Sequence, residues 1–110
     1  MTIGKSSQIL FQARANCMPL NYKNRHIEGR EKKCDLCENE IEDVGHFLIE
    51  CKTLYRERDM NIINKHKVED KKKWIGNILW EEKNVEKLKL MLKGMWDRRI
   101  KIRKEKGIKR

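Results

Sequence analysis

Four side chains that can bind a metal lie close together in the sequence: Cys34, Cys37, His46 and Cys51, with the spacing C-x2-C-x8-H-x4-C. Three thiolates and one imidazole match the donor types and donor number of a tetrahedral structural zinc site. The two residues between the first two cysteines let both sulfurs reach one ion from a tight turn. The sequence therefore predicts that these four residues bind zinc.

Other interpretations of the cysteines and histidines stay open at this stage. Cys34 and Cys37 could be ordinary buried or exposed thiols, while a redox pair is less expected because no strand–helix pattern surrounds them. Outside the array, we expect Cys17 to be a small core residue on an apolar helix face. We expect His26 and His66 to be solvated among their polar neighbours.

The second half of the array raises a geometric question. His46 and Cys51 are five residues apart, which offsets their side chains by about 140° on an ideal α-helix. Either His46 lies in an irregular first turn, or the helix distorts so that both side chains face the ion. Asp43 is expected to cap the helix that carries them.

The elements that must position these residues are predicted to be helices, because Leu, Ile, Lys and Glu dominate and Pro occurs once. Apolar spacing predicts four helices, over about residues 6–17, 44–64, 70–80 and 85–106. Ser6 or Ser7 is expected to cap the first and Asn84 the last. In the third, Trp74, Ile78 and Trp80 are expected to face inward. We predict a small all-α fold around the zinc knuckle, with residues 1–66 as the knuckle module and 67–110 as a basic helical extension.

Charge is distributed unevenly along the chain. The net charge is +10, but residues 34–51 contain six acidic residues and no Lys or Arg. Basic flanks suit a polyanionic partner such as nucleic acid. The acidic knuckle would repel phosphate, so we expect it to stabilise the fold instead. Zinc contributes on the order of 10 kcal/mol in finger peptides, which matters for a chain with so few apolar residues.

The best candidates for phosphate contacts are basic residues near tryptophans, and unpaired bases could stack on Trp74 or Trp96. A basic helix end is also often simply solvated. As an alternative, the apolar stripe of the last helix could dock on a partner protein or pack on the zinc module. The predicted phosphate contacts are Lys71, Lys72, Lys73, Arg98, Arg99, Lys101, Arg103 and Lys104.

Several classes of function are not expected. No apolar stretch is long enough to span a membrane, and no secretory signal is recognisable at the start. The cysteines therefore indicate an intracellular, reducing compartment, either nucleus or cytoplasm. We found no pattern typical of catalysis or of a small-molecule substrate.

Residues 8–60, about half of the chain, resemble a known family. The stretch ILFQARANCMPLN followed by CDLCENEIEDVGHFLIEC is similar to the C-terminal cysteine-rich region of non-LTR (LINE-type) retrotransposon reverse transcriptases, most of all those of insect elements. Gly45 and Lys52 depart from the family, which usually has Glu and often Pro there, but neither departure removes a ligand. The matching positions are Arg14, Leu20, Asn21, Cys34, Cys37, His46, Phe47, Leu48, Cys51 and Arg58.

The resemblance implies a role in binding element RNA or target DNA during target-primed reverse transcription, with the rest of the polyprotein as a partner. It implies no catalytic activity, because the Tyr-x-Asp-Asp polymerase signature is absent from the sequence. We therefore expect a non-catalytic, zinc-stabilised nucleic-acid-binding module. A degenerate remnant without activity is a further alternative.

Overall fold

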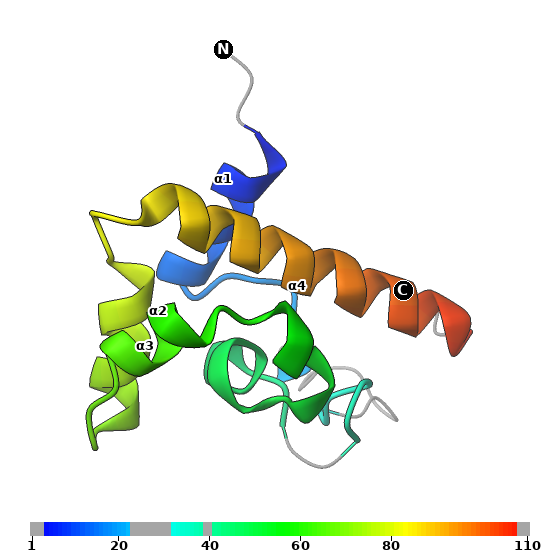
Figure 1. The fold of residues 1–110 in the computed structure, drawn as a ribbon. Coiled ribbons are helices and arrows are strands. Elements are labelled where there is room, and N and C mark those ends of the chain that lie inside the picture. Colours follow the sequence, from blue (N-terminus) through cyan, green and yellow to red (C-terminus); the bar gives the residue numbers. More distant parts are fainter. Residues whose placement is uncertain (1–3, 23–31, 39–40, 108–110) are drawn as a thin grey trace.

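The computed structural model describes residues 4–22, 32–38 and 41–107. These residues are mostly helical, and within them the only β-type pairing is an isolated antiparallel bridge between Lys33 and Ile41. The predicted all-α fold is therefore confirmed. The elements, shown in Figure 1, are α1 (Lys5–Arg14), η2 (His46–Glu50), η3 (Lys52–Glu57), α2 (Met60–Lys65), α3 (Lys71–Leu79) and α4 (Val85–Glu105).

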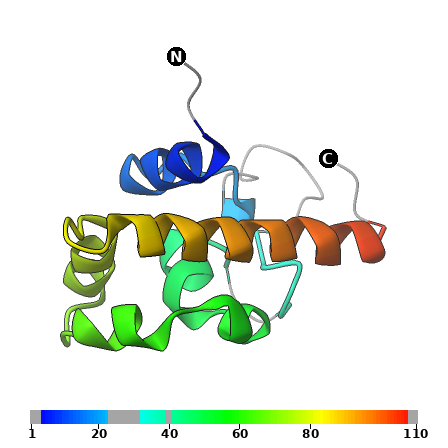
Figure 2. The same cartoon turned by 45° about the horizontal axis from the view of Figure 1, so that its top comes forward.

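The long helix α4 organises the molecule. It lies across the structure with α1 on one side and η2 and η3 on the other (Figures 1 and 2). Its apolar residues Leu88, Leu92 and Met95 are fully buried. The core is one hydrophobic cluster to which residues on both sides of position 66 contribute. The division at residues 66 and 67 stays a prediction.

The first helix is shorter than predicted. It begins after Gly4 rather than at a serine cap, and it ends at Arg14. Asn16 then adopts a left-handed conformation with φ of 53°, which asparagine tolerates better than most residues and which ends the helical path. Cys17 consequently lies beyond the helix and is exposed, so its prediction as a core residue is wrong.

The continuous helix predicted over residues 44–64 is also wrong. A π-helical turn, η2, is followed by the 3-10 helix η3 and then by α2. The breaks occur at Cys51 and Arg58, whose backbones are extended with ψ of 116° and 138°. Apolar periodicity persists through these breaks because all three short helices pack on the same core, and it therefore suggested a single helix.

Helix α3 agrees with its predicted range, and its cap is clear. The Asp70 carboxylate accepts hydrogen bonds from the amides of Lys72 and Lys73. Ile78 is buried and Trp74 is half-buried, as expected. Trp80, in contrast, is exposed, because it follows the last residue of the helix and turns away from the core.

Helix α4 begins after Asn84, as predicted, but the Asn84 side chain makes no capping hydrogen bond. Glu81 instead fixes the turn that precedes the helix, since its Oε1 accepts from the amides of Lys83 and Asn84 at 2.9 and 3.3 Å. Residues 23–31, which include His26 and most of the predicted loop before the knuckle, lie outside the described residues. In the described part of the chain, none of the helices is both long and apolar enough to cross a membrane.

Candidate metal centre

The four predicted ligands converge on one point. Their ligand atoms all lie within 4.8 Å of one another. The Sγ atoms of Cys34 and Cys51 are 3.8 Å apart, and Cys37 Sγ lies 3.2 Å from His46 Nε2. Tetrahedral zinc would separate two sulfurs by about 3.8 Å and a sulfur from a nitrogen by about 3.6 Å, from its usual bond lengths. The widest separation in the cluster, up to 4.8 Å, exceeds these values by about 1 Å, so a shift of that size would close the four donors around one metal ion.

The first two ligands come from a tight turn, as the C-x2-C spacing predicts. The Glu38 amide donates to the Cys34 carbonyl at 2.9 Å, and Glu38 itself has a left-handed φ of 60°. The isolated antiparallel bridge between Lys33 and Ile41 pairs the residue just before the turn with a residue that follows it. This closed turn holds both sulfurs on the same side of the backbone, which is the arrangement that one ion needs.

The second pair is brought together by the π-helical turn. The Asp43 side chain accepts from the His46 amide at 2.8 Å, which confirms the predicted cap. The Cys51 amide then donates to the His46 carbonyl at 2.7 Å, five residues back instead of four. This wider turn brings residues five apart onto one side. Of the two alternatives left open by the spacing, the structure thus shows the distorted helix.

Gly45 lets helix α3 approach this turn. A Cβ atom at position 45 would lie only 2.7 Å from Ile75 Cδ1 and 3.1 Å from Lys71 Cε. Any larger side chain at this position would have to displace the end of the Ile75 side chain. The residue that departs from the retrotransposon pattern is therefore matched to its neighbours in this fold.

Arg58 closes the end of the ligand-bearing turn. Its guanidinium donates to the carbonyls of Leu48, Cys51 and Phe47 at 2.7, 2.6 and 3.0 Å. The carbonyls of Phe47 and Leu48 are at the end of a helical segment, where a helix leaves its last carbonyls without intrahelical partners. The Cys51 carbonyl also accepts from the Leu54 amide at 3.3 Å. Burial lowers the pKa of the Arg58 guanidinium, although nearby negative groups work in the opposite direction. The residue pattern alone did not reveal this role. The one signal in the sequence was that Arg58 belongs to the stretch in which we noted a family resemblance.

Behind the ligands lies a buried ion pair. Arg99 of α4 donates from Nε to Glu42 Oε2 at 2.8 Å and from a terminal nitrogen to Glu42 Oε1 at 2.7 Å. Both side chains are only 2 % exposed. Glu42 Oε2 also lies 3.8 Å from Cys34 Sγ. Helix α4 is thus connected to a metal ligand through one intervening carboxylate.

Two further basic residues of the same helix end reach the knuckle. Arg103 Nε lies 3.2 Å from a carboxylate oxygen of Asp35, and Lys106 Nζ donates to the Asp35 carbonyl at 2.6 Å. Asn21 joins this network by donating its side-chain amide to Asp35 at 2.9 Å. We call Arg99, Arg103 and Lys106 the clasp. They place positive charge against the acidic segment that carries the ligands.

The cluster holds protons when no cation lies within it. Hydrogen bonding to Cys51, together with burial, raises the pKa of Cys34 to about 12. The same contact lowers the pKa of Cys51. Hydrogen bonding to Cys34 outweighs burial at His46 and raises its pKa to about 9. A divalent metal has to displace these protons, so its binding is coupled to their release.

The predicted phosphate contacts do not form one patch. Lys72, Lys73, Lys101 and Lys104 are exposed, and Lys71 pairs with Glu50 at 2.6 Å while remaining half-exposed. Arg98 is 43 % exposed and lies 3.8 Å from Glu57. Arg99 and Arg103 belong to the clasp instead. The lysines of α3 and the basic end of α4 lie toward opposite ends of the molecule (Figures 1 and 2).

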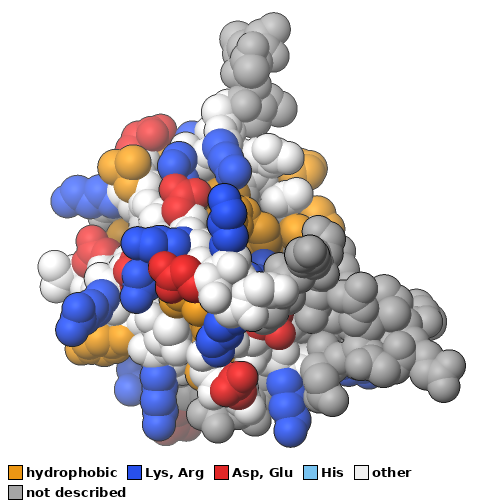
Figure 3. All heavy atoms as spheres, turned by 90° about the vertical axis from the view of Figure 1, so that its right-hand side faces the viewer, with side chains coloured by type: hydrophobic (Ala, Val, Ile, Leu, Met, Phe, Trp, Pro, Cys, Tyr) orange, Lys and Arg blue, Asp and Glu red, His pale blue; other side chains and the backbone are white. Residues whose placement is uncertain are grey.

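The face beside the end of α4 carries mixed charge. In Figure 3, Lys and Arg side chains are spread over this face with Asp and Glu side chains between them. The clasp pairs with Glu42, Asp35 and Glu38, so the strongly acidic segment foreseen from the sequence is partly compensated by neighbouring cations.

The tryptophans considered for stacking are engaged within the fold. Trp74 donates its indole N–H to the Ile63 carbonyl at 2.8 Å. Trp96 meets Phe47 edge to face, with ring centroids 5.9 Å apart. Trp80, expected to be buried, is the exposed tryptophan.

Searches against family models, curated proteins and solved structures find no match to this chain.

Proposed function

We propose that this chain is a non-catalytic, zinc-stabilised nucleic-acid-binding module, equivalent to the C-terminal cysteine-rich region of a LINE-type reverse transcriptase polyprotein. The observation that carries the proposal is the convergence of Cys34, Cys37, His46 and Cys51 within 4.8 Å. The rest of that polyprotein would be its protein partner, and the nucleus or cytoplasm its compartment.

The donor set favours zinc and a structural role. Soft thiolates with one imidazole in a tetrahedral arrangement are typical of zinc, whereas magnesium and calcium select oxygen ligands. Four protein donors would fill the coordination shell. Catalytic zinc sites keep one position for water or substrate, so a closed site supports a non-catalytic module.

The basic residues support a polyanionic partner. The net charge is +10, and Lys72, Lys73, Lys101 and Lys104 expose their side chains. Because the clasp compensates part of the acidic knuckle, that segment opposes phosphate less than its own charge implies. We leave Arg99 and Arg103 out of the proposed phosphate contacts, since both face the knuckle. Lys71 and Arg98 remain in the set as half-exposed members.

No specific observation favours docking on a partner protein through the stripe of α4. Leu88, Leu92 and Met95 are covered by other parts of this chain. A partner could reach them only if the core opened. The nucleic-acid proposal requires no such opening.

The zinc component is tested with Cys37→Ser, compared with Cys17→Ser, which removes an exposed cysteine outside the cluster. Native mass spectrometry should find one zinc ion in the wild type and in Cys17→Ser, but not in Cys37→Ser, which lacks one of the four ligands. Chelation should reduce the helical circular dichroism of the wild type and of Cys17→Ser, since zinc binding is coupled to folding in such modules. A compact, metal-free wild-type protein with an unchanged spectrum after chelation would refute this component.

The nucleic-acid component is tested by titrating binding against salt. Phosphate contacts make the logarithm of the binding constant fall linearly with the logarithm of salt concentration. Each of Lys72→Gln and Lys73→Gln should reduce that slope by about 0.7 to 0.9. Lys52→Gln, which neutralises an exposed lysine outside the proposed set, is the matched control. Binding that does not respond to salt would contradict phosphate recognition.

A further inference from the structure

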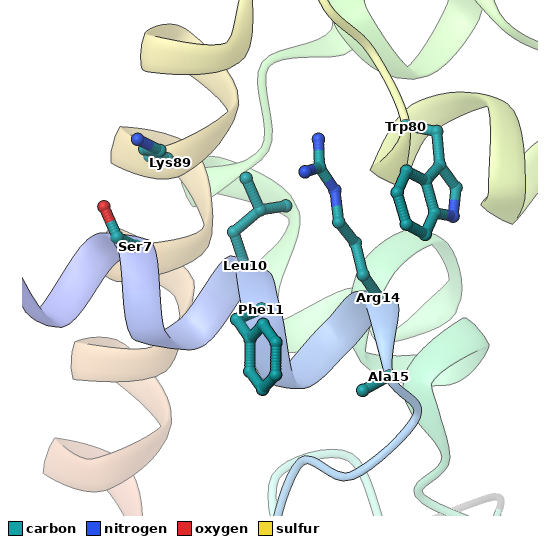
Figure 4. Close-up of a pocket in the computed structure, with 7 residues that line it drawn as sticks. All are labelled: Ser7, Leu10, Phe11, Arg14, Ala15, Trp80 and Lys89. Carbon is teal, nitrogen blue, oxygen red and sulfur yellow. The ribbon is translucent and has the colours of Figure 1, made fainter. Parts of the chain in front are cut away.

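An open groove lies between α1 and the segment that joins α3 to α4. It has a volume of about 400 Å³, and its walls include Leu10, Phe11 and Arg14 from α1, Trp80 from the end of α3, and Lys89 from α4. Figure 4 shows the Arg14 side chain extending beside the Trp80 ring. The groove is remote from the four candidate metal ligands, none of which lines it.

Two aromatic side chains at this groove are exposed to solvent. Phe11 is 70 % exposed and Trp80 is 63 % exposed. Trp80 also lines two neighbouring hollows of the surface, so it stands as a ridge between them. Exposed aromatic rings beside a groove offer flat apolar surfaces on which a planar ligand can stack.

Arg14 is held in place at the ring. Its Nε donates to the Leu79 carbonyl at 2.5 Å, and the centre of its guanidinium lies 4.7 Å from the centroid of the Trp80 ring. The guanidinium and the indole therefore form a preorganised pair. Guanidinium planes and aromatic rings both stack unpaired bases in nucleic-acid-binding proteins.

The charge of the groove selects an anion. Among the described residues that line it, the charged ones are Arg14 and Lys89, and both are basic. Lys89 lies 3.4 Å from Glu86, but that carboxylate is largely exposed and does not line the groove. Flat apolar surface next to positive charge complements a base joined to a phosphate.

We propose that this groove binds single-stranded nucleic acid by stacking an unpaired base on Trp80, with the adjoining phosphates at Arg14 and Lys89. The proposal rests on the proposed function and adds that the ligand carries unpaired bases. A duplex would not serve, because its bases are already stacked and paired inside the helix. An acidic peptide would satisfy the two cations but supplies no base for the indole.

The test measures fluorescence anisotropy of labelled oligonucleotides of about 12 nucleotides, within the usual range of single-strand sites. The zinc-loaded full chain is titrated with oligothymidylate and with an abasic oligomer that has the same phosphates and no bases. Trp80→Leu should weaken oligothymidylate binding about 5- to 150-fold, the range for loss of one stacked base. Its affinity for the abasic oligomer should stay unchanged.

Tyr55→Leu is the matched control, because Tyr55 is equally exposed but lies on η3 outside the groove. Phe11→Leu, on the wall contributed by α1, is a second variant that does not alter the Arg14–Trp80 pair. Circular dichroism verifies that each variant is folded. Tyr55→Leu should bind both oligomers as the wild type does.

The outcomes separate the two proposals. If Trp80→Leu and Phe11→Leu bind oligothymidylate as tightly as the wild type, stacking in the groove is refuted while phosphate binding survives. If the wild type binds the abasic oligomer as tightly as oligothymidylate, bases contribute nothing and the groove proposal is likewise overturned. If the wild type binds neither oligomer, the groove proposal is overturned, and the proposed function then has to rest on duplex nucleic acid alone.

Discussion

The buried pair between Arg99 and Glu42 allows a sharp test of how α4 is attached to the knuckle. In Arg99→Met, the helix keeps an apolar side chain of similar length, but the two charged hydrogen bonds to Glu42 are lost. The Glu42 carboxylate would retain the hydrogen bond from the Asn21 backbone amide at 2.9 Å. A buried carboxylate would then lack a counter-charge.

Removing one partner of a buried ion pair costs about 3 to 5 kcal/mol. We therefore expect Arg99→Met to lower the free energy of unfolding by an amount in this range, which is a large part of the stability of a small domain. Arg98→Met is the matched control, because Arg98 precedes Arg99 on α4 and its ion pair with Glu57 is long and partly exposed. Exposed pairs contribute about 0 to 1 kcal/mol.

The assay is urea unfolding of the zinc-loaded protein, followed by far-UV circular dichroism. The double variant Arg99→Met/Glu42→Leu removes both charges and should recover part of the loss, because apolar replacements of buried pairs are often tolerated. A cost for Arg99→Met no larger than that for Arg98→Met would refute the reasoning. It would show that Glu42 is hydrated, or that α4 is not held against the knuckle in this way.

Three further predictions concern the ends and contacts of the helices. Arg58→Leu should destabilise the protein by about 2 to 4 kcal/mol in urea unfolding, because carbonyls at the end of the ligand-bearing turn lose charged donors. Gly45→Ala should cost about 1 kcal/mol, since its Cβ would meet Ile75, whereas Gly94→Ala, with open space in α4, should stabilise by about 0.5 to 1 kcal/mol. His66 was expected to be solvated, but it is half-buried and its imidazole contacts the Glu81 carboxylate. Burial acts to raise the pKa of Glu81, but hydrogen bonds from backbone amides and from the His66 imidazole outweigh it and hold that pKa below its ordinary 4.5. The carboxylate therefore contributes stability above that value and loses it as pH falls through the lower folded-state pKa, so the urea midpoints of wild type and Glu81→Gln should converge in acid.

The ligand set could be predicted because it depends on local spacing. Four donors within 18 residues define a metal cluster whatever the rest of the chain does, and the Asp43 cap follows from the same local chemistry. The last helix was similarly predictable, since its apolar stripe repeats over several turns. In both cases the informative pattern lies within one short stretch of the sequence.

The errors arose where distant residues decide the conformation. The helix over residues 44–64 breaks because the Arg58 side chain folds back on the preceding turn. Arg99 was predicted to contact phosphate, and only Glu42, 57 positions away, explains why it is buried instead. Trp80 was expected to face inward because it is apolar. It lies one residue beyond the end of α3, however, and it is exposed. Residue type and periodicity contain no information on such partners.

The clasp also bears on the order in which a newly made chain can fold. The four candidate metal ligands lie within one short segment, so a nascent chain can form the knuckle soon after Cys51 leaves the ribosome. Glu42 has to wait for Arg99, 57 residues later, about 3 to 11 seconds at usual synthesis rates. During that interval the acidic segment is accessible to cations from solution. Closure by the final helix would then reduce access to the four candidate ligands and slow the escape of any ion bound there.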